Sequence, residues 1–337
     1  MKIALLTPTF SKFSGIDRVL ELDVEEYSKK GDDVTIFALK STMKSKYAKI
    51  IELGMPKSSF FERLYRLFFH YDFGKVDKYV EMLKDYDLVV SYFYPMSWLA
   101  YKAKKRYGVK YVYYDFGVAF PELFGFFERI YMRLFIMFNN LTVKNCDKAI
   151  SISKFLQGEL KKQTGIKSKV EYCKIDKRRF HKGVGSKKIR DKYKLKNAPV
   201  LLYVGRISPH KGIHLLIKSF NLVLKKIPDA KLLIVGKPTF DSYSKKLKRL
   251  AKGNVIFTGF VPDEELPYYY AACDLYVTAT LWEGFDLPVV EAQTMGKKVV
   301  AFDLCSHPEV VKKGILVKSG DVNGFADGVV RLLRKNA

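Results

Sequence analysis

Short runs of apolar, β-branched residues recur along the chain and alternate with longer segments that have one polar face. The run at residues 2–7 is followed by a loop and by a pattern typical of a helix over residues 16–30, and residues 33–39 form a second apolar run. Such runs indicate buried strands, and Gly31 suits the position just after a helix end. This strand–helix–strand start predicts a parallel, doubly wound sheet.

The alternation stops at a basic, glycine-containing segment and then begins again. Residues 182–197 contain two glycines and seven basic residues, and we expect them to join two domains, 1–182 and 183–337. A chain of 337 residues suits two domains of ordinary size. Further strands are predicted at residues 87–92, 110–114, 148–152, 199–204, 231–236, 254–257, 274–279 and 299–303.

Two segments in the first half interrupt this alternation because they are unusually apolar helices. Residues 58–70 have one polar face, and residues 121–140 have only a narrow stripe formed by Glu122, Arg129 and Arg133. A helix of this kind is typical of a buried core. It also suits an interfacial helix, whose apolar side chains enter lipid while arginine reaches back to water. Both interpretations stay open at this stage.

The charge of the chain indicates an anionic partner or a solubilising surface. The formal net charge is +25, and residues 154–194 hold 15 basic residues against four acidic ones. Nucleic acid and an anionic membrane face both attract such a surface, and a solvated lysine-rich linker has the same composition. The amino-terminal apolar run ends at Pro8 without a cleavage site, no apolar stretch is long enough to span a membrane, and the four cysteines are scattered. We therefore expect a cytoplasmic protein.

The segment 281–295 carries the clearest chemical signal. It places Glu283 and Glu291 on either side of a turn with seven residues between them, among them Gly284 and Pro288. The preceding strand and the proline at a helix start predict strand, loop and helix. Such a loop presents backbone N–H groups, and ionised carboxylates accept hydrogen bonds from vicinal hydroxyls. The segment therefore predicts a site for a polyhydroxylated ligand.

A second segment, residues 205–212, predicts a phosphate site. Arg206 follows a predicted strand, and Lys211 lies where the next helix begins. A guanidinium fork and an ammonium group near a helix N-terminus can hold a diphosphate between them. The spacing differs from that of the Walker loop, in which the glycine-rich stretch ends in Gly-Lys-Ser/Thr.

These two segments together resemble a known family. Glu-Gly-Phe-x-Leu-Pro-x-x-Glu-Ala, from Glu283 to Ala292, is similar to the nucleotide-sugar signature of the retaining glycosyltransferases of family 4, and Gly-Arg…Lys-Gly is similar to their phosphate site. The resemblance is dense over residues 199–330 and only architectural before them. It implies the α/β GT-B fold, in which two doubly wound Rossmann-like domains face each other across a cleft, the first binding the acceptor and the second the donor.

The resemblance also implies roles for individual residues. Arg206 and Lys211 would hold the diphosphate and stabilise the leaving group, Glu283 would bind hydroxyls of the donor sugar, and Glu291 would bind the ribose. No cofactor or metal is implied beyond the nucleoside-diphosphate sugar itself. The candidate catalytic residues are Arg206, Lys211, Glu283 and Asp115, and the candidate donor-binding residues are Gly15, Arg206, Lys211, Gly284, Phe285, Asp286, Leu287 and Glu291.

Three positions depart from the family pattern. Gly15 is the only glycine where relatives carry a glycine-rich turn, and Tyr114-Asp115 stands where relatives often have histidine followed by aspartate. Asp286 replaces a glycine that is common in relatives, which bears on the choice of sugar.

The sequence as a whole predicts a retaining glycosyltransferase. It would move a hexose-type sugar to a hydroxyl acceptor, which is a glycan, a lipid-linked molecule or a small molecule, with an anionic membrane as a further partner. Two alternatives stay open. A non-enzymatic nucleic-acid binder would explain the charge, although no recognised binding motif is present. A glycoside hydrolase would also use paired carboxylates, although it has no use for the two cations.

Overall fold

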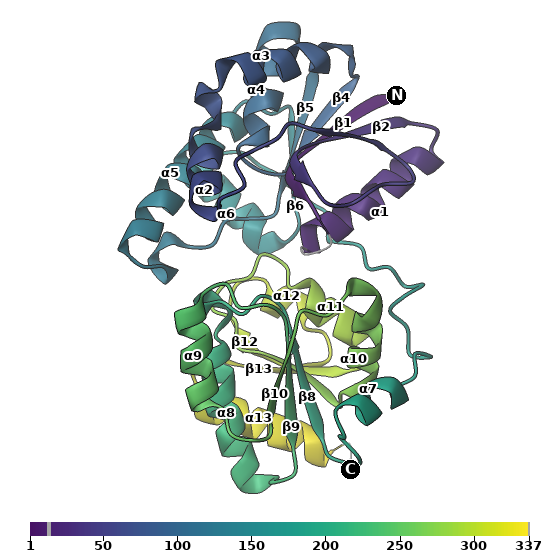
Figure 1. Ribbon diagram of the computed structural model, residues 1–337, viewed down its shortest axis with the longest axis vertical. Coiled ribbons are helices and arrows are strands. Elements are labelled where there is room, and N and C mark those ends of the chain that lie inside the picture. Colours follow the sequence, from purple (N-terminus) through teal and green to yellow (C-terminus); the bar gives the residue numbers. More distant parts are fainter. Residues whose placement is uncertain (12–14, 336–337) are drawn as a thin grey trace. The chain divides into compact units, whose positions relative to one another are not determined.

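The computed structural model describes residues 1–11 and 15–335, which form two compact units (Figure 1). Unit 1 is Met1–Lys174 and unit 2 is Ile175–Ala337, so unit 2 begins at Ile175 and not at the predicted residue 183. The basic segment 182–197 therefore belongs to unit 2, where part of it forms helix α7 (Lys187–Lys192). None of the helices in the described part of the chain is long and apolar enough to cross a membrane.

Unit 1 is built on a seven-stranded parallel sheet with the strand order β3-β2-β1-β4-β5-β6-β7. The chain builds one half of the sheet outward from β1 and then returns to build the other half, which is the predicted doubly wound topology. Its strands are β1 (Lys2–Phe10), β2 (Asp33–Ser41), β3 (Lys49–Glu52), β4 (Leu88–Ser91), β5 (Lys110–Asp115), β6 (Lys148–Ser151) and β7 (Lys169–Val170). Its helices are α1 (Gly15–Lys29), α2 (Ser59–Phe68), α3 (Phe73–Met82), α4 (Met96–Tyr107), α5 (Phe126–Val143) and α6 (Lys154–Thr164), with 3-10 turns η1 (Phe69–Tyr71), η2 (Leu83–Asp85) and η3 (Pro121–Leu123).

The first strand runs three residues beyond its predicted end because Pro8 does not interrupt it. Proline cannot donate to a neighbouring strand, and it is tolerated only where no partner needs its N–H. β4 pairs with β1 only over Ile3 to Leu6. Pro8 therefore lies where β1 pairs with β2 alone, and the strand continues to Phe10.

Unit 2 repeats the same topology with six parallel strands in the order β10-β9-β8-β11-β12-β13. In Figure 1, α8 and α9 lie on one side of this sheet and α10 and α11 on the other. Its strands are β8 (Val200–Val204), β9 (Lys231–Val235), β10 (Val255–Gly259), β11 (Leu275–Thr278), β12 (Lys298–Asp303) and β13 (Gly314–Lys318). Besides α7, its helices are α8 (Ile213–Lys226), α9 (Asp241–Leu250), α10 (Leu266–Ala272), α11 (Leu287–Thr294), α12 (His307–Val310) and α13 (Val322–Arg334), with 3-10 turns η4 (Pro209–Lys211) and η5 (Asp263–Glu265).

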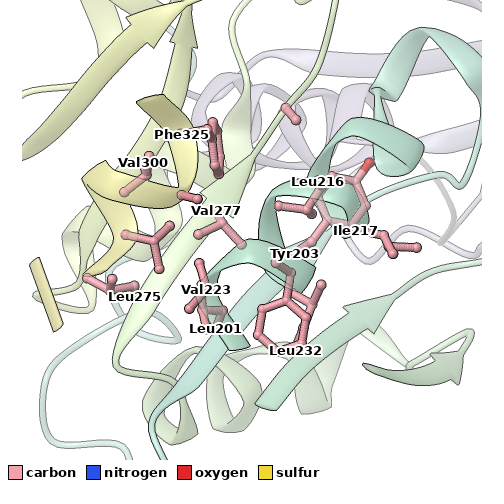
Figure 2. Close-up of a cluster of buried hydrophobic side chains, with 14 of the residues drawn as sticks. Leu201, Tyr203, Leu216, Ile217, Val223, Leu232, Leu275, Val277, Val300 and Phe325 are labelled. Atoms are coloured by element: carbon pink, nitrogen blue, oxygen red, sulfur yellow. The ribbon is translucent and has the colours of Figure 1, made fainter. Parts of the chain in front are cut away.

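The core of unit 2 lies between its sheet and the helices α8, α9 and α13 (Figure 2). Leu201, Leu232 and Leu275 come from three neighbouring strands, and Leu216 and Phe325 come from α8 and α13. Parallel strands are covered by helices on both faces, so their residues are apolar without alternation. This packing fixes the carboxyl ends of the strands, from which the candidate site is built.

The apolar helices of unit 1 are not core helices. The side chains of Phe126 and Phe127 on α5 are 70% and 81% exposed, and those of Phe60 and Phe61 on α2 are 64% and 59% exposed. The buried residues of α5 are confined to its last turns. The interpretation of these helices as buried core is therefore wrong for α2 and for most of α5.

Candidate functional site

The carboxyl ends of β8 and β11 are joined by a close backbone contact. Gly212, just after η4, has φ +62°, and a Cβ atom there would lie 1.8 Å from the carbonyl oxygen of Ala279. The Leu281 N–H also donates to the His210 carbonyl at 2.8 Å. Only glycine permits this approach. The turn that ends at Lys211 is therefore fixed against the segment that leads into α11.

Lys211 and Glu283 form an ion pair in which Nζ donates to Oε2. Their side chains are 14% and 19% exposed, so both groups remain accessible to a ligand. Arg206, directly after Gly205 at the end of β8, is exposed. Two cations and a carboxylate thus share the carboxyl edge of this sheet, where open α/β sheets bind their ligands. The structure brings the predicted phosphate and sugar groups together.

The loop between Glu283 and α11 is buried although it carries a charged residue. Phe285 and Asp286 are each 5% exposed. Asp286 has φ +62° and ψ +67°, a left-handed conformation that aspartate tolerates better than most residues. Its Oδ1 accepts a 3.4 Å hydrogen bond from the Val289 N–H and caps α11. Gly284, Phe285, Asp286 and Leu287 therefore form the predicted loop and helix start.

Glu291 is a buried carboxylate and not a surface acid of α11. It is 2% exposed, and the Tyr270 hydroxyl on α10 donates to its Oε2 at 2.7 Å. Burial of a charge is costly unless hydrogen bonds compensate it. The Tyr270 hydroxyl provides part of that compensation.

Two family models cover these residues and most of the chain. One, described as Glycosyltransferase Family 4, matches residues 13–174, and the other, described as Glycosyl transferases group 1, matches residues 185–337. The chain belongs to the glycosyltransferases of family 4. The resemblance stated from the sequence motifs is thereby confirmed.

The curated relatives of this chain align with it over only part of their own length. O-antigen chain mannosyltransferase B of Escherichia coli is 29% identical over 154 residues, which is 44% of this chain and 40% of that protein. The GDP-mannose-dependent alpha-(1-6)-phosphatidylinositol monomannoside mannosyltransferase of Mycolicibacterium smegmatis is 32% identical over 161 residues, 43% of this chain and 41% of that protein. The matched part thus spans less than half of each of these two relatives.

Solved structures align with nearly the whole chain. Sucrose-phosphate synthase from Thermosynechococcus elongatus aligns with a TM-score of 0.80 and 20% identity, over 99% of this chain and 90% of that one. HepE of Anabaena, in complex with UDP and glucose, aligns with a TM-score of 0.78 and 21% identity, over 100% of this chain and 90% of that one. This likeness confirms the fold, two Rossmann-like domains of the GT-B type.

Two residues of the candidate site were not identified from the sequence. Ser306 and His307, which follow β12, are both fully buried and contact the loop that leads into α11. The Ser306 Oγ donates to the Glu283 carbonyl at 3.1 Å, and His307 Nε2 lies 3.0 Å from Asp286 Oδ2. The one feature of the sequence that could have indicated them is the position of His307 directly before the Pro-Glu-Val-Val segment.

His210, beside the candidate phosphate site, was also missed. Burial, together with the positive charges of Lys211 and Arg206, lowers its pKa to about 3. The imidazole is therefore neutral at physiological pH and adds no charge to the two cations. It can still donate or accept a hydrogen bond beside a ligand.

The remaining candidates lie in unit 1. Asp115 ends β5, is 5% exposed, and accepts hydrogen bonds from the Gly117 N–H at 2.9 Å and the Ser151 hydroxyl at 3.0 Å. Burial raises its pKa to about 6, against the smaller opposing effect of these donors. Gly15 is the first residue of α1, and residues 12–14, part of the predicted loop before it, lie outside the described residues. The catalytic and binding roles of all these residues stay predictions.

Within residues 1–11 and 15–335, no group of three or more histidine, cysteine, aspartate and glutamate side chains could hold a metal ion. The expectation that the reaction needs no metal stays a prediction. The donor set of the site is instead cationic and amide-rich, which suits an anionic ligand.

Proposed function

We propose that this chain is a retaining glycosyltransferase that moves a hexose from a nucleoside-diphosphate sugar to a hydroxyl acceptor. The observation that carries the proposal is the Lys211–Glu283 pair beside Arg206 at the carboxyl edge of the unit 2 sheet. The names of the relatives support the donor class, since one is GDP-mannose-dependent and another is a complex with UDP and glucose. The names of these relatives do not show whether the donor of this chain is a UDP-sugar or a GDP-sugar.

Each side chain has a chemical task in this proposal. Lys211 has three N–H donors, so it can bind the diphosphate while it still donates to Glu283. Arg206 adds a planar fork for phosphate oxygens. The Glu283 carboxylate accepts hydrogen bonds from the sugar, and the amides of Gly284 to Leu287 face the same ligand. Glu291, oriented by Tyr270, accepts hydrogen bonds from the ribose hydroxyls.

In the proposed reaction, the bond between the anomeric carbon and the diphosphate oxygen breaks and the acceptor oxygen bonds to the same face of that carbon. Bond formation on the same face retains the stereochemistry, and transfer of the acceptor's proton to the departing phosphate oxygen balances the charge. The transition state resembles an oxocarbenium ion. Arg206 and Lys211 stabilise the negative charge that develops on the leaving group. The acceptor site is assigned to unit 1. In that unit, Gly15 at the start of α1 is the donor-binding candidate and Asp115 at the end of β5 is the catalytic candidate.

Thermal unfolding with a panel of nucleotide-sugars tests the proposal. A donor present at about 100 times its Kd adds about 2.7 kcal/mol to the stability of the native state, which raises Tm by several degrees. We expect UDP-glucose or GDP-mannose to do so, and the product to keep the anomeric configuration of the donor by NMR. The proposal is wrong if simple glycosides are hydrolysed without nucleotide, or if only nucleic acid binds, with a steep salt dependence.

The exposed apolar side chains of unit 1 give information on the chemical class of the acceptor. α2 and α5 contact each other and carry a group of exposed apolar side chains, which we call the apolar surface. Exposed apolar side chains that gather on neighbouring helices are typical of an interaction site. Its members are Phe60, Phe61, Leu64, Phe68, Phe126, Phe127, Ile130, Met137 and Leu141.

We infer that the apolar surface lies on an anionic membrane and that the acceptor is lipid-linked. Arg63 and Arg133 are exposed on the same two helices, and the chain as a whole carries a charge of +25. Aromatic side chains enter the interface, while each basic residue adds about 1 kcal/mol beside anionic lipid. A protein partner would need no excess of positive charge.

Removal of two phenylalanines from the apolar surface is expected to release the protein from vesicles. Because burial of one phenylalanine contributes about 1.5–3 kcal/mol, Phe126→Ser combined with Phe127→Ser should weaken binding to anionic vesicles about tenfold or more in co-sedimentation. Tyr47→Ser, an exposed aromatic residue outside α2 and α5, is the control and should bind normally. Equal failure of the unaltered protein to bind anionic and neutral vesicles at low salt would contradict the membrane proposal.

A further inference from the structure

Ser306 and His307 hold the loop between Glu283 and Asp286 at both of its ends. The Ser306 hydroxyl fixes the Glu283 carbonyl at 3.1 Å, and the His307 ring contacts the Asp286 carboxylate at 3.0 Å. Both residues are 0% exposed and are consecutive in the chain. The side chain of Glu283 is meanwhile paired with Lys211. The shape of the loop therefore depends on a short segment after β12.

Both ring nitrogens of His307 face hydrogen-bond acceptors. Nδ1 lies 2.7 Å from the Phe302 carbonyl oxygen, and Nε2 lies 3.0 Å from Asp286 Oδ2. A neutral imidazole has one N–H, and a carbonyl cannot donate. The other oxygen of Asp286 accepts from the Val289 N–H, which favours the ionised carboxylate. The arrangement is satisfied when His307 carries both protons and Asp286 carries none.

The charge on His307 also explains why aspartate is tolerated in the loop. Asp286 stands in a left-handed conformation that glycine adopts at no cost. An aspartate brings a negative charge into a buried position, and such a charge requires a partner. His307 is that partner, and the two residues depend on each other.

We propose that His307 is a positioning residue for the donor: as an imidazolium it holds Asp286, and together with Ser306 it fixes the backbone that receives the donor sugar. This inference rests on the proposed glycosyltransferase function. It assigns no contact with the reacting atoms to His307. The affinity for the donor then depends on whether the His307 ring carries its second proton.

The direction of the pH dependence follows from the surroundings of His307. Burial lowers its pKa, but the hydrogen bond and the charge of Asp286, with smaller effects of the Phe302 carbonyl and Glu283, outweigh burial and raise it. The pair therefore contributes fully below about pH 6.5, the ordinary value for histidine, and its contribution is lost as the pH rises through the raised pKa. Donor affinity should fall in that window.

An ion pair and two tyrosines lie around the His307–Asp286 pair. Lys211 neutralises Glu283 in the ion pair described above. Tyr203 on β8 and Tyr276 on β11 both interact with Asp286, and burial raises the pKa of each hydroxyl well above its ordinary value. Both tyrosines are therefore neutral throughout, and His307 is the group whose charge changes.

Two measurements test the proposal. The first is an NMR titration of the histidine rings, in which the resonance missing from His307→Gln identifies His307. The second is the Kd of UDP-glucose and GDP-mannose by calorimetry from pH 6 to pH 9, for the unaltered protein, His307→Gln and Asp286→Asn. His214→Gln is the control, because His214 lies outside this arrangement: it is half-buried and pairs with Tyr243 on α9 at 2.9 Å.

We expect His307 to titrate above 6.5, and donor Kd to rise about tenfold over the pH range in the unaltered protein and in His214→Gln. Kd should be nearly independent of pH in His307→Gln and in Asp286→Asn, the second serving if the first fails to fold. A neutral His307 at pH 6.5, or an unchanged pH profile in both variants, overturns the positioning role alone. Failure of the unaltered protein to bind any nucleotide-sugar at any pH overturns the proposed function as well.

Discussion

Replacement of Lys211 by alanine is expected to lower turnover by about 10²-fold or more. The ammonium group is proposed to stabilise charge that develops on the leaving diphosphate, and loss of one such electrostatic partner has an effect of this order. The loss should appear mainly in kcat, since the interaction strengthens as the bond to the sugar breaks. Steady-state rates with whichever nucleotide-sugar stabilises the protein measure it.

The Lys211 variant should remain folded because its partner Glu283 is 19% exposed and can be solvated by water. An unchanged Tm checks this. Lys226→Ala is the control, since Lys226 pairs with Asp327 on the surface and lies outside the site. If Lys211→Ala turns over at the same rate as Lys226→Ala, then Lys211 is not part of the catalytic machinery.

Replacement of Glu291 by glutamine is expected to weaken the binding of the free nucleoside diphosphate by roughly 10–100-fold. A hydrogen bond to a charged group contributes about 1.5–3 kcal/mol, and Glu291 is proposed to accept such bonds from the ribose. Glutamine has nearly the same shape, and the Tyr270 hydroxyl can still donate to its amide oxygen. Calorimetric titration with UDP and GDP gives the affinities.

A nucleotide whose ribose lacks hydroxyls distinguishes recognition of the ribose by Glu291 from a role of Glu291 in packing. The 2′,3′-dideoxy analogue should bind the unaltered protein and Glu291→Gln with equal affinity, because neither can use the missing hydroxyls. Asp327→Asn, a surface carboxylate that is 66% exposed, should leave all affinities unchanged. Full nucleotide affinity in Glu291→Gln would instead give the buried carboxylate a purely structural role beside Tyr270.

The topology could be predicted from the sequence because the strands are buried on both faces. Runs such as residues 33–39 and 274–279 contain apolar, β-branched residues, and they form β2 and β11 as expected. The boundary between the two units was harder to predict from the sequence. Basic and glycine-rich composition at 182–197 suggested a linker, but Arg190 hydrogen-bonds to backbone carbonyls of unit 2, among them that of Ala272, and the segment packs within that unit. Composition cannot show such long-range contacts.

The site was predictable where it follows a local motif and not where it depends on contacts between distant segments. Lys211 and Glu283 were each identified from their own segments, but their ion pair joins residues 72 positions apart. His307 directly precedes the Pro-Glu-Val-Val segment, but nothing in that segment shows what its ring contacts. Its partner Asp286 is 21 residues away, and only the fold brings the end of β12 to the start of α11.

The orientation of α2 and α5 could not be decided from the sequence for a different reason. An apolar helix with a narrow polar stripe has the same pattern whether its neighbours are protein or lipid. Only the packing shows that Phe127 is 81% exposed while Val143 at the end of the same helix is fully buried.

The apolar surface has a practical consequence for work with the purified protein. Two copies that meet through these phenylalanines would hide the same side chains that a bilayer hides, so concentrated samples without lipid should self-associate and sediment as polydisperse particles. Electrostatic repulsion from the net charge of +25 opposes this contact, and added salt screens that repulsion. Storage in high salt should therefore promote aggregation, whereas a mild detergent should keep the chains apart.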